Sequence, residues 1–159
     1  MKVVCDASAL IALSRIDALN LLEQQVPQLI IPDAVYEELT RGKRKSGAKQ
    51  IIQAKWIQRN AVKDRTSIKQ MDQRLHAGES EVIALAKEIG ADFVILDDAY
   101  ARKVAEAAGL KVVGLLAILL NAKENGIIEQ VRPLLDALRH NGFFIEEDLY
   151  ALLLHRAGE

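Results

Sequence analysis

The sequence predicts an α/β fold with a central, mainly parallel sheet in a single domain. Short apolar runs with β-branched residues alternate with segments of helical length and periodicity, as expected for right-handed βαβ crossovers. The run Phe93–Leu96 is wholly apolar, as in a parallel strand that is covered on both faces. The 159 residues are enough for one domain with a substantial core. We therefore expect one domain over residues 1–159, with a helical C-terminal extension from about residue 115.

The predicted strands are short and follow one another along the whole chain. The first is Lys2–Cys5, an apolar run with two valines, and Phe93–Leu96 is the clearest of the later ones. The others are Leu29–Ile31, a short strand around Trp56, and Lys111–Val113. Trp56 lies in a basic stretch, where it either stacks on a nucleic-acid base or packs into the core, and core packing is the favoured interpretation.

Helices are predicted between these strands and after the last one. Ser8 is expected to cap the first, whose apolar positions include Leu10 and Leu13. A well-patterned helix begins near Gly78 and ends at Gly90. The remaining predicted helices are Leu19–Glu23, Asp33 to near Gly42, one in the basic stretch, Ala99–Ala108, Leu115–Glu124, Ile127–Arg139 and Glu146–Arg156.

Composition excludes several classes of protein. Half of the residues are hydrophobic and 27% are charged, which is ordinary for a globular domain. The apolar runs are too short for a membrane span, and Asp6 interrupts the segment where a signal peptide would be apolar. Cys5 is the single cysteine, so neither an internal disulfide nor a cysteine-rich zinc site is available, and we expect a buried thiol. A cytoplasmic location with no membrane association is the simplest expectation.

Charge is distributed unevenly along the chain. The segment Arg41–Arg74 contains eleven Lys or Arg and two acids, whereas the remainder has ten basic and twenty acidic residues. This pattern fits either a solvated helical face or a cationic surface that attracts a polyanion. Lys43, Arg44 and Lys45 form its densest cluster. They are candidates for nucleic-acid binding, as is Arg102, for which a surface salt bridge is an equal alternative.

Acidic residues recur at corresponding places in the predicted topology. Asp6 follows the first strand, and Asp97 and Asp98 follow Phe93–Leu96. Glu38 and Glu79 lie on helices that can direct a carboxylate to the same edge of the sheet. Clustered carboxylates repel one another unless cations neutralise them, and Mg²⁺ or Mn²⁺ is the expected ion for oxygen ligands. Such ions activate water and stabilise charge on a phosphodiester.

Each acid also has a structural explanation. Asp6 is a suitable cap for the first helix and Asp97 or Asp98 for the later one, and Glu79 suits the positive end of a helix dipole. His76 lies three residues before Glu79 and is a candidate hydrogen-bond partner, whereas the three histidines lack a zinc-site spacing. The joint placement of the acids after strands and at helix starts favours a site over these separate explanations.

Four segments in this order resemble the PIN-domain family, in particular a prokaryotic subgroup related to the toxins of toxin–antitoxin pairs. They are VVCDASALIAL, IPDAVYEEL, GESEVIALA and VILDDAYAR, and the similarity continues into the tail AKENGII…LLDALRHNGFFI. The resemblance implies a Rossmann-like, three-layer PIN-type fold and a metal-dependent ribonuclease. It assigns the acids of the site to Asp6, Glu38, Glu79 and either Asp97 or Asp98, with Ser8 in a supporting position.

The leading hypothesis is thus metal-dependent hydrolysis of RNA, with Asp6, Glu38, Glu79 and Asp97 as catalytic metal ligands. Asp98 is a further candidate ligand. The expected partners are RNA, a cognate antitoxin protein and a second copy of the chain. Two alternatives remain open: an inactive module that binds RNA or protein, and a Mg²⁺-dependent receiver domain with a phospho-accepting Asp.

Overall fold

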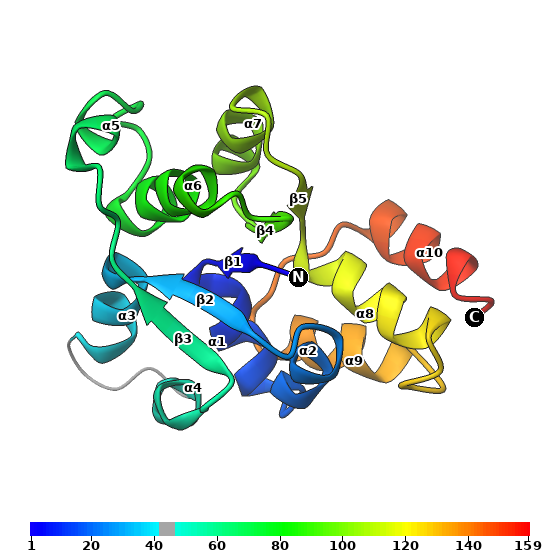
Figure 1. Ribbon diagram of the computed structural model, residues 1–159. Helices are drawn as coiled ribbons and strands as arrows, with labels where there is room; N and C mark the ends of the chain where they lie inside the picture. Colours follow the sequence, from blue (N-terminus) through cyan, green and yellow to red (C-terminus); the bar gives the residue numbers. More distant parts are fainter. Residues whose placement is uncertain (42–46) are drawn as a thin grey trace.

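The computed structural model describes residues 1–41 and 47–159, and within these ranges five strands form one parallel sheet (Figure 1). The strands are β1 (Val3–Cys5), β2 (Leu29–Pro32), β3 (Ile57–Asn60), β4 (Phe93–Ile95) and β5 (Val112–Val113). Their spatial order is β3-β2-β1-β4-β5, and all neighbours are parallel. The predicted α/β fold with a central parallel sheet is confirmed.

Helices cover both faces of the sheet and give a three-layer arrangement. They are α1 (Ala7–Arg15), α2 (Leu19–Gln25), α3 (Asp33–Thr40), α4 (Ala48–Gln53), α5 (Arg65–Lys69), α6 (Ala77–Ile89), α7 (Ala99–Ala107), α8 (Leu115–Glu124), α9 (Arg132–His140) and α10 (Glu147–Arg156). In Figure 1, α6 and α7 lie on one side of the sheet, and α1, α2 and α4 lie on the other. The C-terminal helices α8 to α10 lie together at one end of the molecule in Figure 1, and α8 contacts α2.

The centre of the core is the sheet itself. All three residues of β1 are fully buried, so Cys5 is the buried thiol that the sequence predicts. Burial also raises the pKa of Cys5 well above its ordinary value, which keeps the thiol protonated. Leu10 and Leu13 of α1 pack from one helical layer, and Ile83 of α6 packs from the other. Trp56 is half-buried against this core, as the core-packing interpretation predicts.

One helix is shorter than predicted, and one helix was not predicted. The helix expected over 127–139 begins only at Arg132, because Pro133 inside a longer helix would clash with the carbonyl of Glu129. At the second helical position a proline costs nothing, since its missing N–H would have no partner there. The short helix α5 was not predicted; its N-cap Asp64 accepts hydrogen bonds from the N–H groups of Thr66 and Ser67.

The strand order determines where this fold can bind a ligand. From β1 the chain moves outward to β2 and β3, and it then returns to place β4 on the other side of β1. Ligands of open α/β sheets bind outside the carboxyl ends of the strands, where the order reverses in this way. Here that point lies between β1 and β4, and the residues that follow these strands include Asp6 and Asp97. Within the described residues, no helix is both long and apolar enough to cross a membrane.

Candidate active site

Asp6 leaves β1 directly into the crevice between β1 and β4. Its carboxylate accepts hydrogen bonds from the backbone N–H groups of Ala9 (3.0 Å) and Asp97 (3.3 Å). Asp6 is therefore the N-cap of α1, and the prediction that Ser8 caps this helix is wrong. Both residue types are suitable caps, but Asp6 is the last residue before the helix and Ser8 is already inside it.

Asp6 is an acid whose charge is poorly compensated. The residue is only 4% exposed. The pKa of Asp6 is raised from its ordinary 3.8 to about 7. Burial is the largest cause and the charges of Asp97 and Glu38 add to it, whereas its two hydrogen bonds lower the pKa. Near neutral pH the carboxyl group is thus poised to exchange its proton for another cation.

Asp97 faces Asp6 from the end of β4. Its Oδ1 accepts a hydrogen bond from the N–H of Leu115 (3.1 Å), the first residue of α8. Its Oδ2 is buried and has no hydrogen-bond partner among the described residues. Burial raises the pKa of Asp97, whereas the Leu115 N–H and the charge of Arg102 lower it. An unpaired buried polar atom costs about 1–3 kcal/mol, and more when it is charged, so this oxygen is an available cation ligand.

Arg102 lies beside Asp97 because Gly114 leaves room for it. A Cβ at Gly114 would lie 2.7 Å from Nη1 of Arg102 and 3.8 Å from Oδ1 of Asp97. Arg102 is half-buried and forms no salt bridge within the described part of the chain. The surface salt bridge considered for Arg102 is therefore not found, and its charge is directed at the acidic crevice.

Glu79 lies in the first turn of α6, where His76 holds its carboxylate. His76 Nδ1 accepts hydrogen bonds from the N–H groups of Gly78 (3.1 Å) and Glu79 (3.3 Å), and its Nε2 lies 3.0 Å from Oε1 of Glu79. The other Glu79 oxygen accepts the backbone N–H of His76 (3.3 Å), which completes a capping box. Burial raises the pKa of Glu79; His76 lowers it, and the charges of Asp98 and Glu38 raise it.

Glu38 and Asp98 complete the acidic surroundings. Glu38 is half-buried on α3, and its charge acts on both Asp6 and Glu79. Its neighbour Glu37 is exposed and pairs with Arg41 (3.6 Å), as expected of a residue outside the site. Asp98 is exposed and caps α7 by accepting the N–H of Ala101 (2.9 Å). Asp97 is therefore the acid that faces inward, and Asp98 lies at the rim.

The fit of these residues to a divalent cation rests on their donors and on their charge balance. Asp6, Glu38, Glu79 and Asp97 offer only carboxylate oxygens, and no Lys or Arg of the described chain forms a salt bridge with them. In residues 1–41 and 47–159, no three His, Cys, Asp or Glu side chains are arranged to hold a metal ion. Mg²⁺ usually takes one or two carboxylates directly and keeps several waters, so the donor chemistry of these acids suits such an ion.

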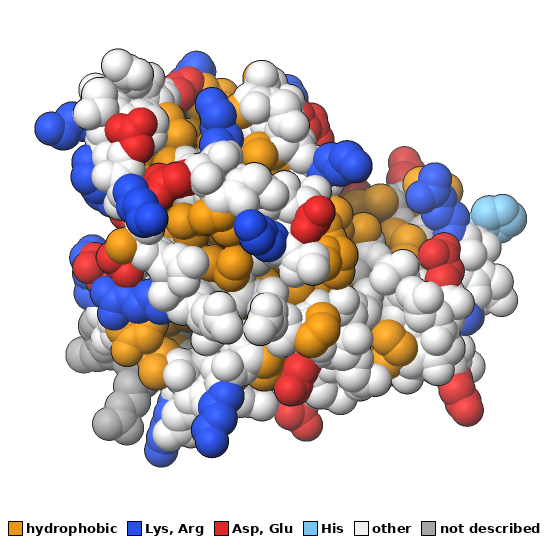
Figure 2. Space-filling model, in the orientation of Figure 1, with side chains coloured by type: hydrophobic (Ala, Val, Ile, Leu, Met, Phe, Trp, Pro, Cys, Tyr) orange, Lys and Arg blue, Asp and Glu red, His pale blue; other side chains and the backbone are white. Residues whose placement is uncertain are grey.

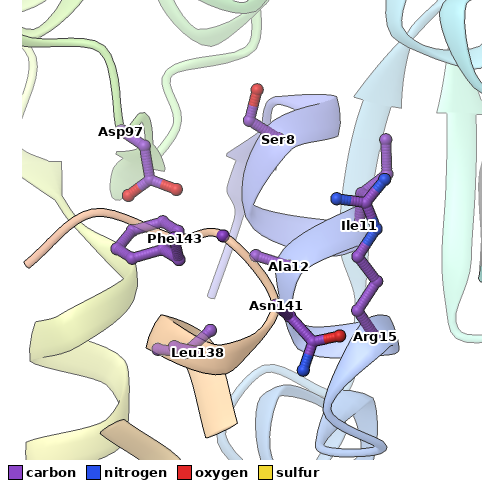
Figure 3. A pocket seen from close by; sticks show the side chains of 9 residues that line it. Ser8, Ile11, Ala12, Arg15, Asp97, Leu138, Asn141 and Phe143 are labelled. Carbon is purple, nitrogen blue, oxygen red and sulfur yellow. The ribbon is translucent and has the colours of Figure 1, made fainter. Parts of the chain in front are cut away.

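A pocket of about 290 Å³ opens next to Asp97 (Figure 3). Its lining combines α1 with the end of α9 and the turn that follows it: Ser8, Ile11, Ala12, Arg15, Asp97, Leu138, Asn141, Gly142 and Phe143. Ser8 is exposed at this pocket, on the first turn of α1. Residues 138–143 are not among the site residues predicted from the sequence. The Asn141-Gly142 pair marks a turn in the sequence, but the local pattern does not indicate that Phe143 lies beside α1.

The described part of the basic segment, residues 47–74, contributes Lys and Arg side chains to one side of the fold. Figure 2 shows Lys and Arg side chains over the side formed by α5, β3 and α3. Several are paired: Arg59 with Asp33 (2.6 Å), Arg65 with Glu81 (3.5 Å) and Arg74 with Asp72 (2.8 Å). Lys43, Arg44 and Lys45 lie outside the described residues.

Comparison with known families settles the classification. A family model described as a PIN domain, DUF3368, matches residues 2–159. The chain belongs to the PIN-domain family. PIN domains are generally nucleases and typically use divalent metals. A search of curated proteins gives no match.

A solved structure supports the same fold. The PIN domain is similar to a PilT N-terminus domain protein from the hyperthermophilic archaeon Sulfolobus solfataricus P2, with a TM-score of 0.59 and 18% sequence identity. The match covers 77% of this chain and 93% of the archaeal one. At this sequence identity the similarity establishes the fold alone.

Proposed function

We propose that this PIN domain is a metal-dependent ribonuclease that hydrolyses phosphodiester bonds at the crevice between β1 and β4. Asp6 and Asp97 are the proposed direct ligands of Mg²⁺ or Mn²⁺, with Glu38 and Glu79 acting through water. When bound, the ion would activate water and stabilise the charge that develops on the phosphate. The observation that carries the proposal is the buried, unpaired Oδ2 of Asp97 beside Asp6, whose pKa is raised to about 7.

The protein's own residues have distinct parts in this scheme. Asp6 must give up its proton before it can bind a cation, so activity should rise from pH 6 to pH 8. His76 fixes the side chain of Glu79 by hydrogen bonds at both of its oxygens. Arg102 is positioned to contact a phosphate next to Asp97, and Ser8 to assist at the entrance of the crevice. Asp98 remains a candidate ligand at the rim.

The first test is cleavage of labelled single-stranded RNA by protein stripped with EDTA. Cleavage should be absent, return with Mg²⁺ or Mn²⁺, and remain absent in Asp97→Asn, which keeps the acceptor for Leu115 but lacks the second carboxylate oxygen. Glu37→Gln is the matched control, since it removes an exposed acid next to Glu38 that is already paired with Arg41 (3.6 Å). Full cleavage in EDTA, or by Asp97→Asn, would contradict the proposal.

Two alternatives are separated by different observations. Receiver domains have the doubly wound strand order 2-1-3-4-5, whereas this sheet has the order 3-2-1-4-5, so the receiver hypothesis is not supported. An inactive binding module would bind RNA in the same assay without cutting it at any metal concentration.

We further propose that the basic segment Arg41–Arg74 guides RNA to the acids. Reversing Lys43, Arg44 and Lys45 to Glu should weaken RNA binding and flatten its salt dependence, because each lost phosphate contact reduces the logarithmic slope by about 0.7 for a single strand. Single-turnover cleavage at saturating RNA should change much less. Reversal of three exposed lysines elsewhere, Lys87, Lys103 and Lys111, makes the same charge change and serves as the control. Equal effects from both triple variants would show that only net charge matters.

We also propose that the chain is the toxin of a toxin–antitoxin pair. The resemblance of its sequence to such toxins supports this proposal. The partner would be a small antitoxin protein encoded next to this chain, and a homodimer is the proposed oligomer. Co-expression with the neighbouring small reading frame should yield a stable complex in which RNA cleavage is suppressed. Unchanged cleavage in the presence of that product would contradict the toxin assignment.

A further inference from the structure

The pocket beside Asp97 has two apolar walls from different parts of the chain. Ile11 and Ala12 of α1 form one side, and Leu138 and Phe143 form the other. Figure 3 shows the ring of Phe143 next to the Asp97 carboxylate, with Arg15 and Asn141 on the side away from it. A flat, apolar ligand with polar edges would therefore fit between these walls.

The wall that carries Phe143 is held in place by the backbone. Gly142 adopts a left-handed conformation (φ 87°) after α9, and this turns the chain so that the N–H of Phe143 donates to the carbonyl of Leu138 (2.9 Å). Arg139 Nη2 donates to the carbonyl of Ile145 (2.8 Å), a buried residue just beyond the turn. The backbone on both sides of Phe143 is thus held, and its ring is half-buried.

The polar groups around the walls match the edges of a nucleoside. The amide nitrogen of Asn141 donates to the carbonyl of Ala137 (2.8 Å), which leaves its oxygen toward solvent as an acceptor. Arg15 is exposed and forms no salt bridge in the described part of the chain, so its charge is available to a phosphate. At about 290 Å³ the pocket is at the small end of ligand pockets, which span about 300–1,000 Å³. One base fits it better than a larger free ligand.

We propose that this pocket receives one unstacked base of the RNA adjacent to the bond that is cut, with Phe143 as the stacking platform. The inference rests on the proposed ribonuclease function and goes beyond it: the RNA is read at one position by insertion of a base. Single-stranded RNA is commonly recognised in this way, by stacking of splayed bases on aromatic rings and Arg planes. The pocket also shares Asp97 with the acidic crevice, so an inserted base would fix the neighbouring phosphate at the acids.

The test compares the binding of two five-nucleotide RNAs, one intact and one that lacks its central base. Fluorescence anisotropy measures the affinity of each RNA for the protein in EDTA at low salt. Wild type should bind the intact RNA about 5- to 150-fold more tightly than the abasic one, the range expected for one stacked base. Phe143→Leu keeps an apolar side chain but lacks the ring face, and should bind both RNAs equally. Phe143→Tyr should retain the difference.

Phe144→Ala is the matched control, because Phe144 is 82% exposed and lies outside the pocket. It should behave as wild type, and thermal melting of each variant checks its fold. Equal binding of intact and abasic RNA by wild type would overturn the inference, as would equal losses in Phe143→Leu and Phe144→Ala. If binding depends on the central base but no cleavage occurs in Mn²⁺, the proposed ribonuclease function is refuted and the proposed base pocket is retained. If metal-dependent cleavage is the same for the intact and the abasic RNA, the ribonuclease function is retained and the base pocket is refuted.

Discussion

Replacing Asp6 by Asn is expected to reduce RNA cleavage by more than about 100-fold while the fold stays intact. Even residues that only orient metal ligands cost about 10- to 100-fold when they are changed, and Asp6 is a proposed direct ligand. Asn keeps an oxygen that can accept the N–H of Ala9, so the cap of α1 survives. Single-turnover cleavage with Mn²⁺ measures the effect, with circular dichroism as the check on folding.

The control for this experiment is Asp98→Asn, which changes the exposed acid one position after Asp97. It should retain substantially more activity than Asp6→Asn, because Asp98 caps α7 and faces solvent. Near-normal cleavage by a folded Asp6→Asn protein would remove Asp6 from the mechanism. Equal losses in both variants would place Asp98 among the direct ligands.

The same Asp6→Asn substitution is expected to stabilise the metal-free protein at pH 8. The pKa of Asp6 is about 7 in the folded protein and 3.8 is its ordinary value, so the folded state holds a proton that the unfolded state loses. The stability contributed by that proton is present below about pH 4 and is lost as the pH rises through 7. The pKa difference corresponds to about 4 kcal/mol, an order-of-magnitude figure. Wild type should therefore unfold more easily at pH 8 than at pH 5.

Urea unfolding in EDTA at pH 5 and pH 8 measures this difference. The free energy of unfolding should fall between the two pH values by more in wild type than in Asp6→Asn. Asp148→Asn is the control, since Asp148 is exposed on α10 and its loss should leave the pH dependence unchanged. Identical pH dependence of wild type and Asp6→Asn would mean that Asp6 is ionised without penalty, and the charge argument for a cation would fail.

Much of the architecture follows from local pattern. The runs around Val3, Ile30 and Val94 are apolar and β-branched, and in a parallel sheet the residues after such strands must meet at one edge. For this reason the proximity of Asp6 and Asp97 follows from the sequence once the strands are placed. The structure shows this proximity as a hydrogen bond from the N–H of Asp97 to the Asp6 carboxylate.

Other features depend on contacts that local pattern does not encode. Asp97 and Asp98 both follow β4, and only the approach of α8 and Leu115 identifies Asp97 as the inward one. The pocket wall at Leu138 and Phe143 meets α1 across more than a hundred residues of chain. The predicted helix over 127–139 follows from helical periodicity alone. Pro133 restricts that helix to its C-terminal part, because a proline is not tolerated inside a helix.

The most direct test of the account is titration of the metal-free protein with Mn²⁺ at pH 6, without RNA, by calorimetry in buffers of different ionisation enthalpy. A ligand that holds its proton at this pH must release it when the metal binds. We expect Mn²⁺ to bind wild type with net proton release, Glu37→Gln to behave the same way, and the double variant Asp6→Asn, Asp97→Asn to lose binding. Undiminished Mn²⁺ affinity in the double variant would contradict the claim that the acids between β1 and β4 form the metal site.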